Sequence, residues 1–289
     1  MQLPLRLFLL AVFLSSTGLI SAQMPFYTDN ADVTDLGTLH FEIYNEIDAL
    51  QSAQYPDLRQ NTANFKANYG LPRNLELDFD IPYLYISRAS GSQASSGNGD
   101  ADMGIKWNFH KAAHPRSLPA VSASFYVEFP TGDEAQGLGS GLNDYWLNAI
   151  LQEPFSDKTR LDFNFGYLFA GNTSTGVLGI QTTRGHVYTG GLALQHDYTQ
   201  RLTLGSELFG GVADKNGLGK NQLQALAGGA YALNNRSSIT FALLGGAHIA
   251  SPKIGCQFGY EIDFPLRHAS PPIKSAFSDP TLPLQGRNP

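Results

Sequence analysis

Residues 74–85 read NLELDFDIPYLY, and this stretch decides the fold. Large apolar side chains occupy the odd positions from 75 to 85, while acids occupy positions 76, 78 and 80. This alternation is typical of a β-strand, whose successive side chains point to opposite faces. In a soluble sheet the apolar face would pack on a core. In a membrane barrel it would face lipid, and the acids would line a wet lumen.

The same alternation recurs along the chain and separates these two readings. Short and long connections alternate between the segments, as in an outer-membrane barrel with tight turns at one end and longer loops at the other. The sequence therefore predicts an all-β fold: a single transmembrane antiparallel meander barrel of about twelve strands, with ten to fourteen as the range. The facing of the glycine- and alanine-rich segments within 186–247 is left open. The predicted strands are 39–44, 62–71, 75–85, 101–109, 121–129, 144–151, 160–169, 186–196, 201–211, 221–232, 238–247 and 254–264.

Barrels of more than eight strands begin to enclose space that side chains would have to fill if the aromatic-rich faces pointed inward. We therefore expect these faces to contact lipid and the charged faces to surround water. A secreted soluble β protein remains the alternative. The predicted lipid-facing residues are Phe79, Trp107, Phe125, Phe163, Phe165 and Phe258. The predicted pore-lining residues are Glu42, Lys66, Glu76, Asp78, Asp80, Asp102, Lys106, Glu128, Asp162, Arg160, Glu261 and Asp263.

The chain ends have their own composition. Residues 1–22 combine Arg6, an apolar run and small residues, which predicts a signal peptide cleaved near Ala22 and export to the bacterial outer membrane. Residues 23–37 are acidic and without alternation, and we expect a disordered periplasmic lead rather than a hook or partial plug. The barrel is expected over 38–265, and 266–289 is expected to be a proline-rich periplasmic tail.

Composition excludes several classes of function. The formal net charge is −6, which disfavours nucleic acid as a partner. Cys256 is the only cysteine, so no intrachain disulfide can form. No phosphate-loop or other cofactor motif is found, because the glycine-rich Gly137–Gly141 lacks the lysine and following helix of such a loop and reads as a flexible external loop. No cofactor is expected.

Four stretches resemble a known family: PFYTDNADVTDLGTLHFEIYNE (25–46), GDADMGIKWNF (99–109), VEFPTGDEAQGLGSG (127–141) and LDFNFGYLFAGN (161–172). They are similar to the outer-membrane β-barrel family labelled "putative MetA-pathway of phenol degradation", whose members are described as transporters. The resemblance implies uptake of aromatic or other hydrophobic compounds. Many such barrels end on an aromatic residue that serves assembly, so Phe264 is expected to act as an internal signal for the barrel-assembly machinery.

Two candidate metal sites have simpler interpretations. Glu76, Asp78 and Asp80 share a strand face and could hold Ca²⁺, but we favour a solvated lumen wall paired with Lys66 and Lys106 on the neighbouring strands. His110 and His114 have the spacing of a helical zinc pair. They lie in a predicted turn without a metalloprotease glutamate, so no metal is expected there either.

The predicted function is a channel or transporter for small molecules, with outer-membrane lipid and a small solute as partners. The excess of acids on the inward faces predicts a preference for cations or neutral solutes. An enzyme is not expected. An outer-membrane lipid hydrolase would need a serine beside His186, His196 or His248 on one outward face, and no strand offers that pair clearly. A non-conducting structural or adhesive barrel is the other alternative.

Overall fold

The computed structural model describes residues 25–51, 58–87, 94–170, 185–213, 221–248 and 250–266. The expected signal peptide and almost all of the expected tail lie outside these residues. The strands are β1 (Thr38–Ala49), β2 (Arg59–Leu71), β3 (Leu75–Ser87), β4 (Ser95–Asn98), β5 (Ala101–His110), β6 (Ala120–Phe129), β7 (Asp144–Ser156), β8 (Thr159–Ala170), β9 (Gly185–Asp197), β10 (Leu202–Ala213), β11 (Gln222–Asn234), β12 (Ser237–Gly246) and β13 (Ile254–Pro265).

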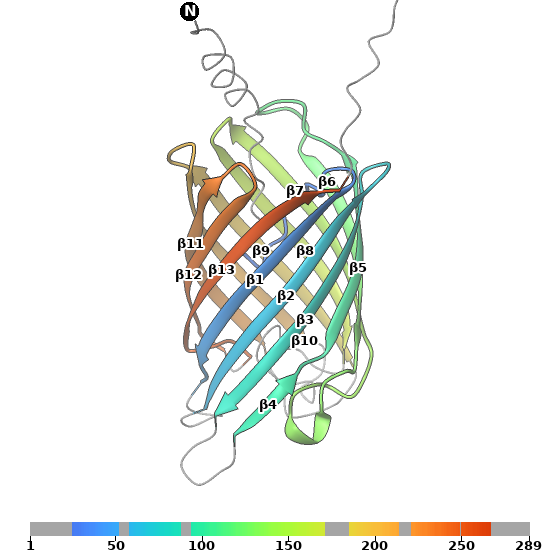
Figure 1. Ribbon diagram of the computed structural model, residues 1–289, viewed down its shortest axis with the longest axis vertical. Coiled ribbons are helices and arrows are strands. Elements are labelled where there is room, and N and C mark those ends of the chain that lie inside the picture. The colour runs from blue at the N-terminus through green and yellow to red at the C-terminus, as the bar shows by residue number, and fades with distance from the viewer. Residues whose placement is uncertain are drawn as a thin grey trace, which may run out of the picture.

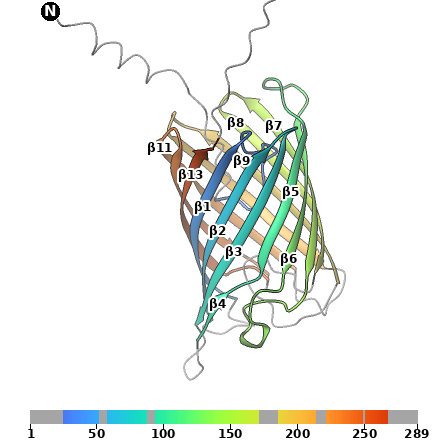
Figure 2. The ribbon, with the colours of Figure 1, turned by 45° about the vertical axis from the view of Figure 1, so that its right-hand side comes forward.

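Twelve of these strands close into an antiparallel barrel (Figures 1 and 2). Each ring strand pairs with the next along the chain, and β13 pairs with β1 in a register that places Thr38 opposite Pro265. The predicted transmembrane meander of about twelve strands is confirmed. The remaining strand, β4, pairs with the C-terminal part of β3. It was not among the strands predicted from the sequence. It continues β5 beyond an irregularity at Gly99, whose N–H donates to the Pro82 carbonyl at 2.8 Å.

The barrel wall is apolar outside and polar inside. On β3 the odd positions face out, where Phe79 is 47% exposed, and the even positions face in, where Glu76 is 2% exposed. A lumen surrounded by charge and an exposed aromatic belt is the arrangement of a membrane barrel and the inverse of a soluble one. The predicted lipid-facing side chains are all exposed: Phe79, Trp107, Phe125, Phe163, Phe165 and Phe258.

The structure also fixes the facing that the sequence left open in 186–247. On β9 the even positions face out, as with Leu192 and Leu194, while Ala193 and Gln195 are buried inside. The outward faces of β10 and β11 mix leucines with small residues, which weakens the alternation without breaking it. Among the described residues, no helix is long and apolar enough to cross a membrane.

The two ends of the barrel differ. Tight turns such as 72–74, where Arg73 and Asn74 adopt positive φ, lie at the end where β1 begins, at the top of Figure 1. We call it the short-turn end, and the other the long-loop end. At the long-loop end the loop 130–143, with its 3-10 helix η1 (Glu134–Gln136), is not the flexible loop expected for Gly137–Gly141. Its Leu138 is buried against Leu84 and Ile86.

The lead segment, residues 25–37, lies inside the barrel, so the expectation of a disordered lead is wrong. It lies in the lumen toward the short-turn end, where it bonds to inward side chains of β10, β8 and β5. Within the segment, the Asn30 side-chain oxygen accepts from the Asp32 N–H at 2.9 Å. Its end joins the wall through a parallel bridge between Leu36 and Gly70 before β1 begins. Part of the interior is therefore filled by the chain itself, which leaves a cavity described below.

Candidate functional site

The lead segment is held in the lumen by carboxylates and amides of the wall. Glu207 on β10 accepts hydrogen bonds from the Tyr27 N–H at 2.9 Å, the Thr28 N–H at 2.7 Å and the Thr28 hydroxyl at 2.8 Å. On β8, Asn164 donates to the Asp29 carbonyl at 2.8 Å and accepts from the Asp29 N–H at 2.7 Å. Buried backbone groups must find such partners, so these wall side chains replace the sheet hydrogen bonds that the lead segment lacks.

Further anchors lie on the opposite wall. Lys106 is fully buried, and its ammonium lies 2.8 Å from an Asp29 oxygen. The Asn108 amide donates to the Ala31 carbonyl at 2.6 Å, and the Thr34 N–H donates to Glu76 at 2.5 Å. The lead segment therefore spans the lumen from β10 to β3, and it is fastened along its length.

Apolar packing of Phe26 and a hydrogen bond of the Tyr27 phenol also hold the lead segment in the lumen. Phe26 packs in a buried cluster with Ala193, Leu226, Ala242 and Leu244. The Tyr27 hydroxyl donates to Glu46. Burial raises the pKa of the Tyr27 phenol well above its usual range, and the Glu46 carboxylate adds to that rise, so the phenol remains protonated as a donor.

Glycines in the wall make room for the lead segment. A Cβ at Gly191 would lie 2.2 Å from the Thr28 hydroxyl oxygen, and one at Gly70 would lie 2.1 Å from the Asp35 carbonyl oxygen. Such distances are far inside van der Waals contact. Both glycines thus mark where the lead segment approaches the wall closely.

Seven ionisable side chains lie directly opposite one another on seven neighbouring strands, and we call them the acidic row. Cross-strand partners in antiparallel pairs are about 5 Å apart, so the row is continuous. It begins near the short-turn end on β13 and ends at the first residue of β7, at the long-loop end, because it runs across tilted strands. The acidic row is Glu261, Glu42, Lys66, Asp80, Asp102, Glu128 and Asp144.

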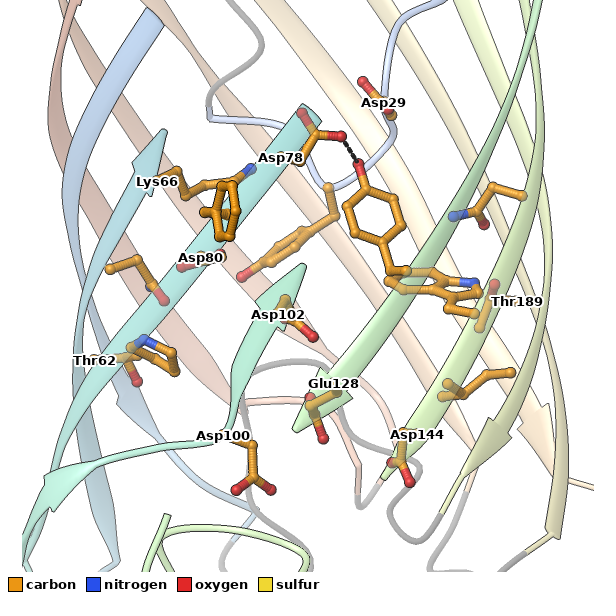
Figure 3. Close-up of a pocket in the computed structure, with 18 of the residues that line it drawn as sticks. Asp29, Thr62, Lys66, Asp78, Asp80, Asp100, Asp102, Glu128, Asp144 and Thr189 are labelled. Carbon is orange, nitrogen blue, oxygen red and sulfur yellow. Dashed lines mark hydrogen bonds between the residues drawn. The ribbon is translucent and has the colours of Figure 1, made fainter. Parts of the chain in front are cut away.

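The end of the row nearest the long loops lines a cavity of about 310 Å³ (Figure 3). The lead segment borders it through Phe26, Tyr27 and Asp29. The wall contributes carboxylates and aromatic rings to the same space. These carboxylates and rings include Asp78, Asp80, Asp102, Glu128, Tyr126 and Trp146.

The structure places all of the predicted pore-lining residues on inward positions. Lys66, Asp78, Asp80, Asp102 and Glu128 line the cavity. Arg160 lies 3.8 Å from Asp162, and Asp263 contacts His40 at 2.7 Å, both toward the short-turn end. Their role in conduction stays a prediction. The other five, Glu42, Glu76, Lys106, Asp162 and Glu261, are buried inside the barrel.

The proposed pairing of Lys66 and Lys106 with the acids of β3 holds in register but not in detail. Lys66 lies opposite Asp80 and Lys106 opposite Glu76. The Lys66 ammonium nevertheless lies 3.8 Å from Glu42, and that of Lys106 contacts Asp29 of the lead segment. Among the described residues, no group of three His, Cys, Asp or Glu is placed to hold a metal ion.

Two inward aromatic residues and two residues of the lead segment were not among those predicted from the sequence to line the pore. Tyr126 and Trp146 sit at inward positions of the alternation, which would have revealed them as lumen aromatics. The contacts of Tyr27 and Asp29 could not be found in the same way, because their partners Glu207 and Asn164 are 180 and 135 residues away along the chain. The three histidines considered for a hydrolase do not line the cavity. His186 contacts the Tyr167 hydroxyl, His196 contacts Thr159 at 2.8 Å, and His248 is exposed in a loop.

A closed twelve-stranded ring with an apolar exterior and a charged interior defines the class of outer-membrane β-barrel proteins. Within that class, residues 28–255 match the family described as "Putative MetA-pathway of phenol degradation", and the chain belongs to this family. The resemblance noted from the sequence is confirmed. No curated protein sequence matches the chain.

Solved structures share the fold. The COG4313 outer membrane channel from Pseudomonas putida F1 superposes with a TM-score of 0.63 at 16% identity, covering 81% of this chain and 98% of that chain. The KdgM porin in complex with disordered oligogalacturonate gives 0.53 at 10% identity, covering 78% and 99%. The NanC porin gives 0.51 at 7% identity, covering 77% and 98%. At these identities the likeness concerns architecture.

Proposed function

We propose that this protein is an outer-membrane channel for small solutes, including aromatic ones. The observation that carries the proposal is the acidic row, which follows the lumen wall from near one end of the barrel to the other. Fixed charges of one sign along a water-filled passage select permeant ions and raise their local concentration. Six carboxylates against one lysine favour cations over anions.

The family and its fold relatives support passage rather than catalysis. The COG4313 protein is named as a channel, KdgM and NanC are named as porins, and the family name refers to phenol degradation. An aromatic solute is consistent with the Tyr126 and Trp146 rings in the cavity. The chemistry needed is selection by size and charge, and no covalent step is required.

The orientation follows from loop lengths. Outer-membrane barrels keep short turns in the periplasm and longer loops outside. The short-turn end, with the lead segment and β1, would then face the periplasm, and loop 130–143 would face the exterior. Cleavage of a signal peptide near Ala22 would leave a mature chain that begins just before the lead segment. Phe264, exposed on β13, would serve the assembly machinery.

Planar-bilayer recording tests the proposal. The purified barrel should give discrete channel events, and a salt gradient should give a reversal potential of the sign set by cations. Liposome swelling should report flux of small neutral and cationic solutes. A barrel that shifts mobility on boiling, and so is folded, yet gives neither current nor flux would overturn the channel and leave a structural or adhesive role.

A further inference from the structure

The cavity in the lumen has the dimensions of a small-molecule site. Its volume of about 310 Å³ is at the lower end of ligand pockets, enough for one substituted aromatic ring. The lead segment borders it on one side. On the other, loop 130–143 packs on Leu84 and is tied to Asp100, which accepts from the Gly132 N–H at 2.9 Å and the Ser140 N–H at 2.6 Å. Leu84 and Asp100 both line the cavity.

The charge inside this cavity is one-sided. Asp80 lies directly opposite Asp102, and Asp102 lies directly opposite Glu128. Like charges in directly opposed positions destabilise a sheet. Lys66 is the single basic side chain in the lining, and it is shared with Glu42 outside the cavity. A bound cation would offset this repulsion.

A buried acceptor in the same space points to an occupant. Asp78 is 5% exposed, and its Oδ2 accepts from the Tyr126 hydroxyl at 2.9 Å (Figure 3). Its Oδ1 is buried and has no hydrogen-bond partner in the described part of the chain, and the same holds for Oδ1 of Asp80. Buried carboxylate oxygens normally find donors, so two carboxylates that line the cavity keep charge that the surrounding protein does not neutralise by hydrogen bonds to these oxygens.

Aromatic rings lie beside these carboxylates on the same part of the wall. Tyr126 and Trp146 project from neighbouring strands, with ring centroids 6.5 Å apart, and Tyr44 and Phe209 complete the lining. Aromatic faces attract organic cations and also pack on apolar rings. In contrast, the carboxylates are spread over three strands and do not converge as metal ligands do.

From this combination we propose that the cavity is a binding site for a small organic cation that carries an aromatic ring, such as an arylalkyl amine or ammonium. The carboxylates of Asp78, Asp80 and Asp102 hold the positive group, and the rings of Tyr126 and Trp146 pack on the aromatic body. The inference names a substrate class for the proposed channel and rests on that function for its physiological meaning. Binding itself can be measured without transport.

The chain provides its own reporter. It contains two tryptophans, Trp107 on the lipid face and Trp146 in the cavity. Trp107→Phe leaves Trp146 as the single tryptophan, which can be excited selectively over the tyrosines. Three probes of similar shape differ in charge: benzyltrimethylammonium, benzyl alcohol and benzoate. In detergent we expect saturable quenching by the cation, at least about tenfold weaker binding of the alcohol and none of benzoate. Equal responses to cation and alcohol, or no saturable response, would overturn the proposal.

Matched variants locate the effect. In the Trp107→Phe background, Asp102→Asn with Glu128→Gln removes two cavity charges, and we expect cation affinity to fall about tenfold or more. The control pair, Glu153→Gln with Asp157→Asn, removes two charges near the β7–β8 turn and should leave affinity within about twofold. Gel mobility before and after boiling verifies that each variant is folded. Equal losses in both pairs would mean a general charge effect and would refute the site.

The outcomes separate binding from transport. Saturable cation binding without solute flux would overturn the proposed channel and retain the site. Flux without cation binding would retain the channel and overturn the site.

Discussion

The two ends of the lumen use the same residue types for different purposes. Toward the short-turn end, Glu76, Glu207 and Asn164 are satisfied by backbone groups of the lead segment. Toward the long-loop end, Asp80 and Asp102 are cross-strand neighbours, and both line the cavity. The comparison teaches that a polar lumen position is structural where a chain segment occupies it and available to solutes where none does.

The largest expected effect comes from removing the lead segment. Deletion of residues 25–36 empties the short-turn half of the lumen while leaving every strand intact. Single-channel conductance should rise severalfold, because the narrowest part of a pore dominates its resistance. Cation preference should persist, since the acidic row remains. Unchanged conductance in a folded deletion variant would show that the lead segment does not limit passage. The two ends of the lumen would then not differ in how they admit solutes.

The next effect concerns ion selectivity. Asp102→Asn with Glu128→Gln should move the cation-to-anion permeability ratio toward unity, because two fixed charges leave the passage. Reversal potentials in a salt gradient measure the ratio. Conductance should change less than after the lead deletion. The pair Glu153→Gln with Asp157→Asn serves as the control, and an equal shift in that pair would argue against the cavity as the selective region.

Glu207 tests how firmly the lead segment is held. Glu207→Ala leaves two backbone N–H groups and a hydroxyl of the lead segment without their acceptor, at a cost of about 1–3 kcal/mol for a buried unsatisfied group. We expect intermittent wide openings in bilayer records and faster proteolysis near Tyr27. Glu207→Gln retains an acceptor oxygen and should show a smaller effect. If both variants behave as the parent does, Glu207 does not anchor the segment.

The smallest expected effect is the difference between alanine substitutions at two adjacent glycines, Gly191 and Gly190. Gly191→Ala places a Cβ 2.2 Å from the Thr28 hydroxyl and should loosen the lead segment, seen as occasional wide openings. Gly190→Ala is the matched control, because its Cβ faces lipid and meets its nearest atom at 3.8 Å. The two variants add the same methyl group to neighbouring positions. Identical records from both would show that the close approach at Gly191 is unimportant.

Much of this fold could be predicted because barrel strands carry a local signal. Each wall residue is placed by its neighbours two positions away, so Phe79, Lys66 and Asp102 could all be assigned a face from the alternation alone. The facing of residues 186–247 could not be predicted, because small residues occupy both faces of these strands. At Gly191 the inward glycine is explained by the Thr28 side chain against it.

The lead segment could not be predicted for a physical reason. Its residues have no periodicity, and they are ordered by Glu207 and Asn164, whose positions depend on the completed ring. The same holds for loop 130–143, where Asp100 organises the backbone of Gly132 and Ser140 from 32 and 40 residues away. Composition predicts disorder in both segments, and the tertiary contacts override it.

The seat of Tyr27 and Thr28 has a consequence for biogenesis. Their acceptor, Glu207, follows them by 180 and 179 residues, and the ring that presents it is sealed only when the first strand meets the last. The contacts of Tyr27 and Thr28 with Glu207 can therefore form only once β10 is in place. We therefore expect the lead segment to dock late in folding, after the part of the wall that accepts it has formed.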